Sequence, residues 1–156
     1  MLLTLDVENT VTKRNGKMHL DPFEPTNTLV MVGMLDDYGN EDIVTFDHSE
    51  QQPTTDGRRI VQDKLDAAHL LIAHNAPHDL LWLWESGFTY DGEVYDTMLG
   101  EYVLQRGQKQ PLSLEACAER YELDTKKQDT LKEYFSKGTS TRDIPHDELS
   151  EYLSHD

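Results

Sequence analysis

The chain has 156 residues, of which 37% are hydrophobic, so one domain can bury a core without disulfides or a structural metal. Its 30 acidic and 14 basic residues give a formal net charge of −16, which repels a nucleic-acid backbone unless cations or a basic partner intervene. The single cysteine, Cys117, excludes an intrachain disulfide, and its helix-like surroundings predict a packed thiol; no apolar run suits a signal peptide or a membrane span.

The N-terminal third of the chain predicts a β-meander. Residues 2–7 form a short apolar run typical of a buried strand. Residues 9–27 carry Gly16 and two prolines without any period, which predicts a long loop. Residues 28–35 and 42–46 are rich in β-forming side chains and flank a turn, so we expect a hairpin that extends the first strand.

The rest of the chain predicts helices that alternate with strands. Helical spacing and capping residues place helices at 57–68, 77–87, 96–106, 113–121, 128–136 and 146–156, and apolar β-rich runs place strands at 69–74 and near 93–95. Asp96 is explained as a helix N-cap. Trp82 and Trp84 cannot face the same way on one helix, so we expect one in the core and the other partly exposed. The order of elements predicts one α/β domain with a mixed sheet flanked by helices.

A D-x-E pair lies at the end of the first predicted strand. Asp6 and Glu8 are two residues apart, so their side chains point to the same face of the strand and can reach one cation. A cluster of oxygen ligands suits Mg²⁺ or Mn²⁺ better than zinc. In isolation, the same pair is more often a surface feature of an edge strand.

A second acidic motif spans a strand-to-helix turn. Asn75 and Asp79 are four residues apart, and Asp79 falls in the first turn of the predicted helix. An acidic side chain there also stabilises the positive end of the helix dipole, which is the alternative explanation. His74 and His78 suggest zinc, but no cysteine pair or third histidine completes such a set, so we expect them to support the site or the substrate.

The third motif is Y-x-x-x-D in the last predicted helix, where Tyr152 and Asp156 share one face. With the D-x-E and N-x-x-x-D motifs before it, the sequence resembles the DEDD exonuclease family of the ribonuclease H-like fold. The tyrosine is typical of the DEDDy branch. The sibling DEDDh branch has a histidine five residues before the last aspartate, where this chain has Glu151.

The resemblance covers nearly the whole chain, including the segments DTMLGEYVL, LSLEACAERYEL and IPHDELSEYLSHD, which are most similar to proofreading domains of phage-type family A DNA polymerases. It implies a ribonuclease H-like mixed sheet, with a three-strand antiparallel meander plus parallel strands, flanked by helices. It implies a 3′→5′ exonuclease domain over residues 1–156, truncated within or just after its last motif helix. The substrate would be the 3′ end of single-stranded DNA, the partner a DNA polymerase domain or subunit, and the location the cytoplasm, that of the host for a phage protein.

The resemblance also implies a role for each motif residue. Asp6, Glu8 and Asp156 would hold one divalent cation, Mg²⁺ or Mn²⁺. Asp6 would bridge to a second cation, which Asp79 would hold through water, and the two ions would promote phosphodiester hydrolysis together. Tyr152 would orient the attacking water.

Residues beside the acids are further candidates. Asn9, Thr10 and Asn75 are predicted to contact the terminal nucleotide. Lys13 and Arg14 are candidates for phosphate contacts, although solvated loop charges are an equally good explanation of them.

Two other functions fit the sequence. A non-catalytic exonuclease-like scaffold or polymerase-docking module is the first, because the fourth acid, Asp156, is the last residue of the sequence, where the family's helix continues. An RNA-trimming nuclease is the second, because DNA is favoured over RNA by the resemblance alone.

Overall fold

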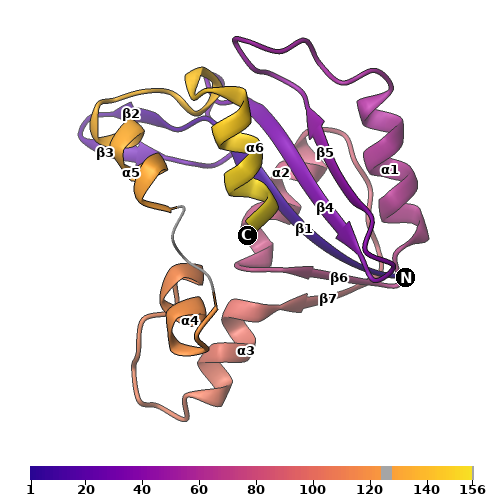
Figure 1. Cartoon of the computed structure of the whole chain (residues 1–156), viewed down its shortest axis with the longest axis vertical. Coiled ribbons are helices and arrows are strands. Elements are labelled where there is room, and N and C mark those ends of the chain that lie inside the picture. Colours follow the sequence, from indigo (N-terminus) through magenta and orange to yellow (C-terminus); the bar gives the residue numbers. More distant parts are fainter. Residues whose placement is uncertain (124–127, 156) are drawn as a thin grey trace.

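The computed structural model describes residues 1–123 and 128–155 (Figure 1). Its main sheet has five strands in the order β5-β4-β1-β6-β7. These strands are β1 (Leu2–Asn9), β4 (Leu29–Asp36), β5 (Glu41–Thr45), β6 (Leu70–Ala73) and β7 (Glu93–Asp96). The β5-β4-β1 meander is antiparallel, whereas β1, β6 and β7 are parallel. The mixed α/β sheet predicted from the sequence is therefore confirmed.

One face of the sheet is buried beneath α1 (Gly57–Ala67) and α2 (Ala76–Glu85). Its core is built from apolar side chains of the sheet and the two helices, which include Leu3, Leu5, Val7, Val32, Met34, Val44, Val61, Leu65, Leu71, Trp82 and Leu83. Trp82 is 3% exposed and Trp84 is 51% exposed, as their spacing predicted. The period of two in β1 therefore turns Asp6 and Glu8 to the opposite face of the sheet.

That opposite face carries the C-terminal elements α5 (Gln128–Ser136), the 3₁₀ turn η1 (Thr141–Asp143) and α6 (His146–His155). Figure 1 shows α6 lying across β1 and β4. A second core joins these elements to the sheet through the side chains of Val30, Met31, Leu131, Ile144, Leu149 and Leu153. The packing places α6 on the acidic face of β1. Asp156, the last residue of the predicted helix, lies outside the described residues.

At the parallel edge of the sheet, α3 (Thr97–Leu104) and α4 (Leu114–Arg120) extend away from the other helices (Figure 1). The buried carboxylate of Glu101 joins the two helices through an ion pair with Arg120, at 3.3 Å. Cys117 is buried and has no disulfide partner, which confirms the predicted packed thiol. These two helices therefore form one side of the space next to β6 and β7.

The prediction of one long loop over residues 9–27 is wrong. The segment contains a small hairpin of β2 (Thr12–Arg14) and β3 (Lys17–His19), which forms a separate two-stranded sheet. Asn15 and Gly16 form its turn with φ of 51° and 75°, and positive φ at both central residues is what a type I′ hairpin turn requires. The Asn-Gly pair is therefore the signal that identifies the hairpin.

The α-helices begin and end within about two residues of the bounds predicted from the sequence, which is the usual uncertainty at helix ends. Among the helices that the structure describes, none has the length and apolar character needed to cross a membrane.

Candidate active site

The first two acidic motifs meet where β1 passes the start of α2. The backbone N–H of Val7 donates a hydrogen bond to Oδ1 of Asp79, at 3.1 Å. Val7 stands between Asp6 and Glu8, so the carboxylate of the second motif rests against the backbone of the first. β6 pairs with β1 only alongside residues 2–4, and beyond them Asp79 takes the place of a neighbouring strand. The point where β6 stops pairing with β1 therefore lets residues that are far apart in the sequence come together.

The start of α2 is held in position by Asp96. Its carboxylate accepts hydrogen bonds from the backbone N–H groups of Asn75, at 2.9 Å, and Ala76, at 3.2 Å. It also accepts from the N–H of Met98, which confirms the predicted N-cap of α3. Asn75 has a left-handed φ of 64° and Pro77 follows in the first turn of the helix. One carboxylate therefore fixes the strand-to-helix turn that positions Asp79.

Asp79 is buried, with only 2% of the residue exposed. Burial, and next the negative charge of Asp6, raise the pKa of Asp79 to about 8, while the N–H of Val7 acts in the opposite direction. A carboxyl group in this environment stays largely protonated at neutral pH unless a positive charge lies beside it. Two repelling carboxylates, with half-buried Glu8 on the same strand face as Asp6, suit a divalent cation.

The complete ligand set stays a prediction. The structure brings Asp6 and Asp79 together and puts Glu8 on the same strand face, but Asp156 lies outside the described residues. Within residues 1–123 and 128–155, no group of three or more histidine, cysteine, aspartate or glutamate residues is close enough to hold a metal ion. Among the described residues, Asp6 and Asp79 therefore form a pair of acids that repel each other, with Glu8 on the strand face of Asp6. They do not form a complete set of metal ligands.

Tyr152 lies on α6, above the acidic face of β1. It is half-buried and packs against the second core. Its position on the helix that crosses β1 is compatible with the predicted catalytic role, which stays a prediction.

Asn9 and Thr10 are buried at the end of β1. The amide of Asn9 donates to the carbonyls of Thr10 and Leu20, at 2.8 and 3.1 Å, and its Oδ1 accepts from Nε2 of His78, at 2.9 Å. Burial lowers the pKa of His78, which favours its neutral ring. Asn75 is exposed. Contact of these residues with a nucleotide stays a prediction.

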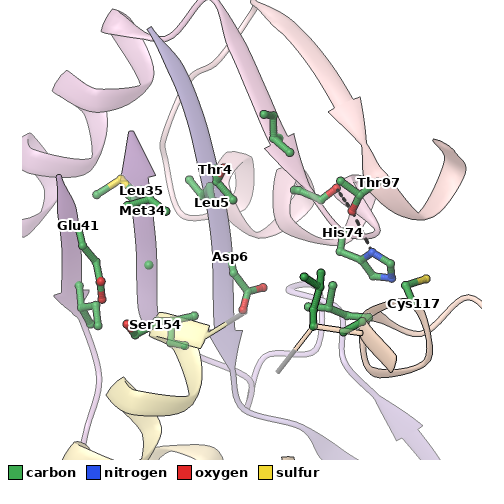
Figure 2. Close-up of a pocket in the computed structure, with 18 of the residues that line it drawn as sticks. Thr4, Leu5, Asp6, Met34, Leu35, Glu41, His74, Thr97, Cys117 and Ser154 are labelled. Carbon is green, nitrogen blue, oxygen red and sulfur yellow. Dashed lines mark hydrogen bonds between the residues drawn. The ribbon is translucent and has the colours of Figure 1, made fainter. Parts of the chain in front are cut away.

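A cavity of about 510 Å³ opens beside Asp6. Figure 2 shows the Asp6 carboxylate pointing toward the space between Ser154 of α6 and His74. Nδ1 of His74 is hydrogen-bonded to Oγ1 of Thr97, at 2.9 Å, at the carboxyl ends of the parallel strands. Sequence reasoning missed Thr97, Ser154 and the lining role of Cys117. The meeting of parallel-strand ends at one crevice was the available signal for Thr97.

Comparison with known protein families and with curated proteins gave no match. Among solved structures, the chain is similar to one described as the apo form of the nuclease, with a TM-score of 0.55 and 20% identity over 81% of this chain. The chain therefore shares its fold with a nuclease. It is also similar to the family B DNA polymerase from the hyperthermophilic archaeon Pyrobaculum calidifontis, with a TM-score of 0.50 and 13% identity over 77% of this chain.

The likeness extends over part of each neighbour, because the chain covers 54% of the nuclease and 18% of the polymerase. The ribonuclease H-like mixed sheet implied by the sequence resemblance is confirmed. At these identities the likeness shows the fold, and the activity is a separate question.

Proposed function

We propose that this chain is a metal-dependent 3′→5′ exonuclease that removes nucleotides from single-stranded DNA and proofreads for a DNA polymerase. The observation that carries the proposal is the hydrogen bond from Val7 to the buried carboxylate of Asp79, which sets that carboxylate against the D-x-E motif. A buried acid beside a second acid is costly to the fold unless a cation offsets their repulsion. Such a cost is typical of a functional site.

In this proposal Asp6, Glu8, Asp79 and Asp156 hold two divalent cations, Mg²⁺ or Mn²⁺. Bound cations would supply a lowered pKa for an attacking water and would stabilise negative charge on the phosphodiester in the transition state. The N–H of Val7 holds the Asp79 carboxylate in a fixed orientation. A site that is already oriented in this way can bind cations without reorganisation.

The remaining residues position the substrate and the water. Tyr152 orients the attacking water through its hydroxyl group. The terminal nucleotide occupies the cavity beside Asp6, whose volume of about 510 Å³ is within the range of ligand sites. In this proposal Asn75, which is exposed at its turn, contacts the nucleotide, whereas Asn9 and Thr10 line the buried end of β1. The released product is a 5′-nucleotide.

The charge of the chain favours a role within a larger assembly. The net charge of −16 opposes binding to DNA at long range, and cations at the carboxylates reverse the field only locally. We infer that a DNA polymerase domain or subunit supplies the basic surface that retains the DNA.

The proposal is tested by incubating the protein with a 5′-labelled single-stranded oligonucleotide and Mg²⁺ or Mn²⁺. A ladder of shortened products is expected, and Asp6→Ala should abolish it. Asp63→Ala, which removes an exposed charge on α1, is the matched control and should leave the ladder intact. A matched RNA oligonucleotide decides between DNA and RNA. Shortening that persists in Asp6→Ala would refute the assignment of the site.

A non-catalytic scaffold is the second candidate, and a specific observation favours it. In the described ranges no three potential ligands are gathered for a metal ion. A scaffold would bind a polymerase but would neither shorten the oligonucleotide nor bind divalent cations at millimolar concentrations.

A further inference from the structure

Three of the 14 basic residues of this acidic chain lie close together in the stretch that follows the D-x-E motif. No acidic residue stands between Glu8 and Asp21, whereas that interval contains Lys13, Arg14 and Lys17. All three lie in the hairpin of residues 12–19, which we call the basic arm. Figure 1 shows its strands β2 and β3 extending beyond the end of β1, away from β6 and β7. A local basic element on a chain with a net charge of −16 is typical of a site that binds a negatively charged ligand.

One face of the basic arm is fastened to the chain that follows it. Arg14 forms an ion pair with buried Glu24, at 3.0 Å, and Oγ1 of Thr12 donates to Asn27, at 2.7 Å. The amide of Asn27 donates in turn to the carbonyl of His19, at 2.9 Å. These bonds hold the hairpin in one orientation, so the arm is a fixed projection of the fold.

The other face of the arm is open to solvent. Lys13 and Met18 are cross-strand partners, so their side chains lie on the same face, opposite to the fastened one. Met18 is 59% exposed, and Lys13 and Lys17 are exposed. Neither lysine forms an ion pair within the described part of the chain. The arm thus offers the ammonium group of Lys13 beside the exposed side chain of Met18 on its open face. The ammonium group of Lys17, the cross-strand partner of Arg14, lies on the other face, next to the turn.

The arm is also tied directly to the acidic site. The carbonyl of Leu20, just after the arm, accepts from Asn9, at 3.1 Å, and from the indole N–H of Trp82, at 2.9 Å. Asn9 follows Glu8 in β1, and Trp82 shares α2 with Asp79. Because Lys13 follows Glu8 by five residues, their α-carbons are at most roughly 18 Å apart even in an extended chain.

The cavity and the arm lie on opposite sides of the carboxylates along β1. The cavity is lined by Thr4, Leu5 and Asp6, and the arm follows the other end of the strand. A single-stranded nucleic acid whose last nucleotide occupies the cavity can therefore continue past Glu8 toward the arm.

We propose that the basic arm is a binding site for the phosphate backbone of single-stranded nucleic acid, which it holds a few nucleotides before the 3′ terminus. Lys13 and Lys17 contact phosphates, and Met18 packs against the bases. The position of the arm on the strand rests on the proposed function, but its binding of a polyanion does not require catalysis. Positive charge that follows the phosphate backbone binds single strands without sequence preference, and the affinity that it supplies depends on salt.

The arm is tested with a fluorescent oligothymidylate in EDTA, so that metal-dependent hydrolysis cannot occur. Binding is followed by anisotropy between about 50 and 200 mM salt, a range over which phosphate contacts weaken measurably. The variant Lys13→Gln/Lys17→Gln is compared with Arg59→Gln/Lys109→Gln, which removes the same charge from exposed positions on α1 and after α3. Circular dichroism verifies that both variants are folded.

The arm variant is expected to bind at least about tenfold more weakly at the lowest salt, and its slope of log K against log salt should be smaller by about 1.4, or about 0.7 for each lost phosphate contact. The control variant should bind like the wild type. Equal affinity and slope in the two variants, or no salt-dependent binding by the wild type, would overturn the proposal. A wild type that binds through the arm but never shortens DNA in Mg²⁺ would contradict the proposed function alone.

Discussion

Leu153 of α6 packs into the place where Gly33 of β4 has no side chain. A β-carbon added to Gly33 would lie 2.6 Å from Cγ of Leu153, closer than real β-carbons approach any atom. Gly33 is also the cross-strand partner of Asp6. The absence of a side chain at one position of β4 therefore lets the helix that carries Tyr152 approach the strand that carries the first acid.

Gly33→Ala should displace α6 from the sheet. Overpacking of a tight contact costs about 1–3 kcal/mol of unfolding free energy, and nuclease activity should fall because Tyr152 moves with the helix. Urea unfolding measures the first effect. In a double-mutant cycle with Leu153→Ala, which removes the clashing atoms, the two costs should be less than additive. Additive costs would show that the two residues do not compete for this space.

Tyr152→Phe should lower the rate of hydrolysis by roughly 100-fold or more, because it removes a hydroxyl group that positions the attacking water. The melting temperature should change little, since the ring that packs against the second core is retained. Single-turnover rates with saturating oligonucleotide isolate this step from binding. An unchanged rate would remove Tyr152 from the catalytic residues.

Asp96 should behave as a capping residue. Asp96→Ala removes the acceptor shared by the starts of α2 and α3 and should cost about 0.5–2 kcal/mol, whereas Asp96→Asn keeps a side-chain oxygen and should cost less. Thermal unfolding compares the two variants. Loss of divalent-cation binding in Asp96→Asn would instead make Asp96 a ligand.

The start of α6 should make stability depend on pH. His146 lies edge to face against His48, with ring centroids 5.2 Å apart. Burial and then His48 lower the pKa of His146, while the nearby Asp147 and Glu50 act in the opposite direction. A histidine pKa lower in the folded state than in the unfolded state contributes stability that is present above the unfolded value, about 6.5, and lost as the pH falls through the folded value.

Between about pH 7 and pH 5 the urea midpoint of the wild type should therefore fall relative to that of His146→Gln, since the two proteins share the opposite contribution of Asp79, whose raised pKa stabilises the fold as the pH falls. Parallel pH profiles of the two proteins would show that His146 does not carry this dependence.

The sequence predicted those parts of the molecule that local periodicity determines. Alternation in β1 put Asp6 and Glu8 on one face, and the turn before α2 put Asp79 in its first helical turn. The hairpin of residues 12–19 was missed because its strands are short and mainly polar, although Asn15 and Gly16 specify its turn.

The site as a three-dimensional arrangement depends on contacts between distant residues. The hydrogen bond from Val7 to Asp79 can form because β6 stops pairing with β1 before it reaches Val7. Asp96 can accept hydrogen bonds from the start of α2 because β7 lies beside β6. The approach of Ser154 to the cavity depends on the packing of α6. No local pattern encodes these distances, which is why the lining of the cavity was not predicted.

Divalent-cation binding tests the central claim most directly. Mn²⁺ is titrated into the wild type and into Asp79→Asn, whose amide oxygen can still accept from the N–H of Val7. Calorimetry should show binding to the wild type at millimolar concentrations or below, weakened at least about tenfold in the variant because an anionic ligand is lost. Equal affinity in both proteins, or no binding to the wild type, would contradict the account.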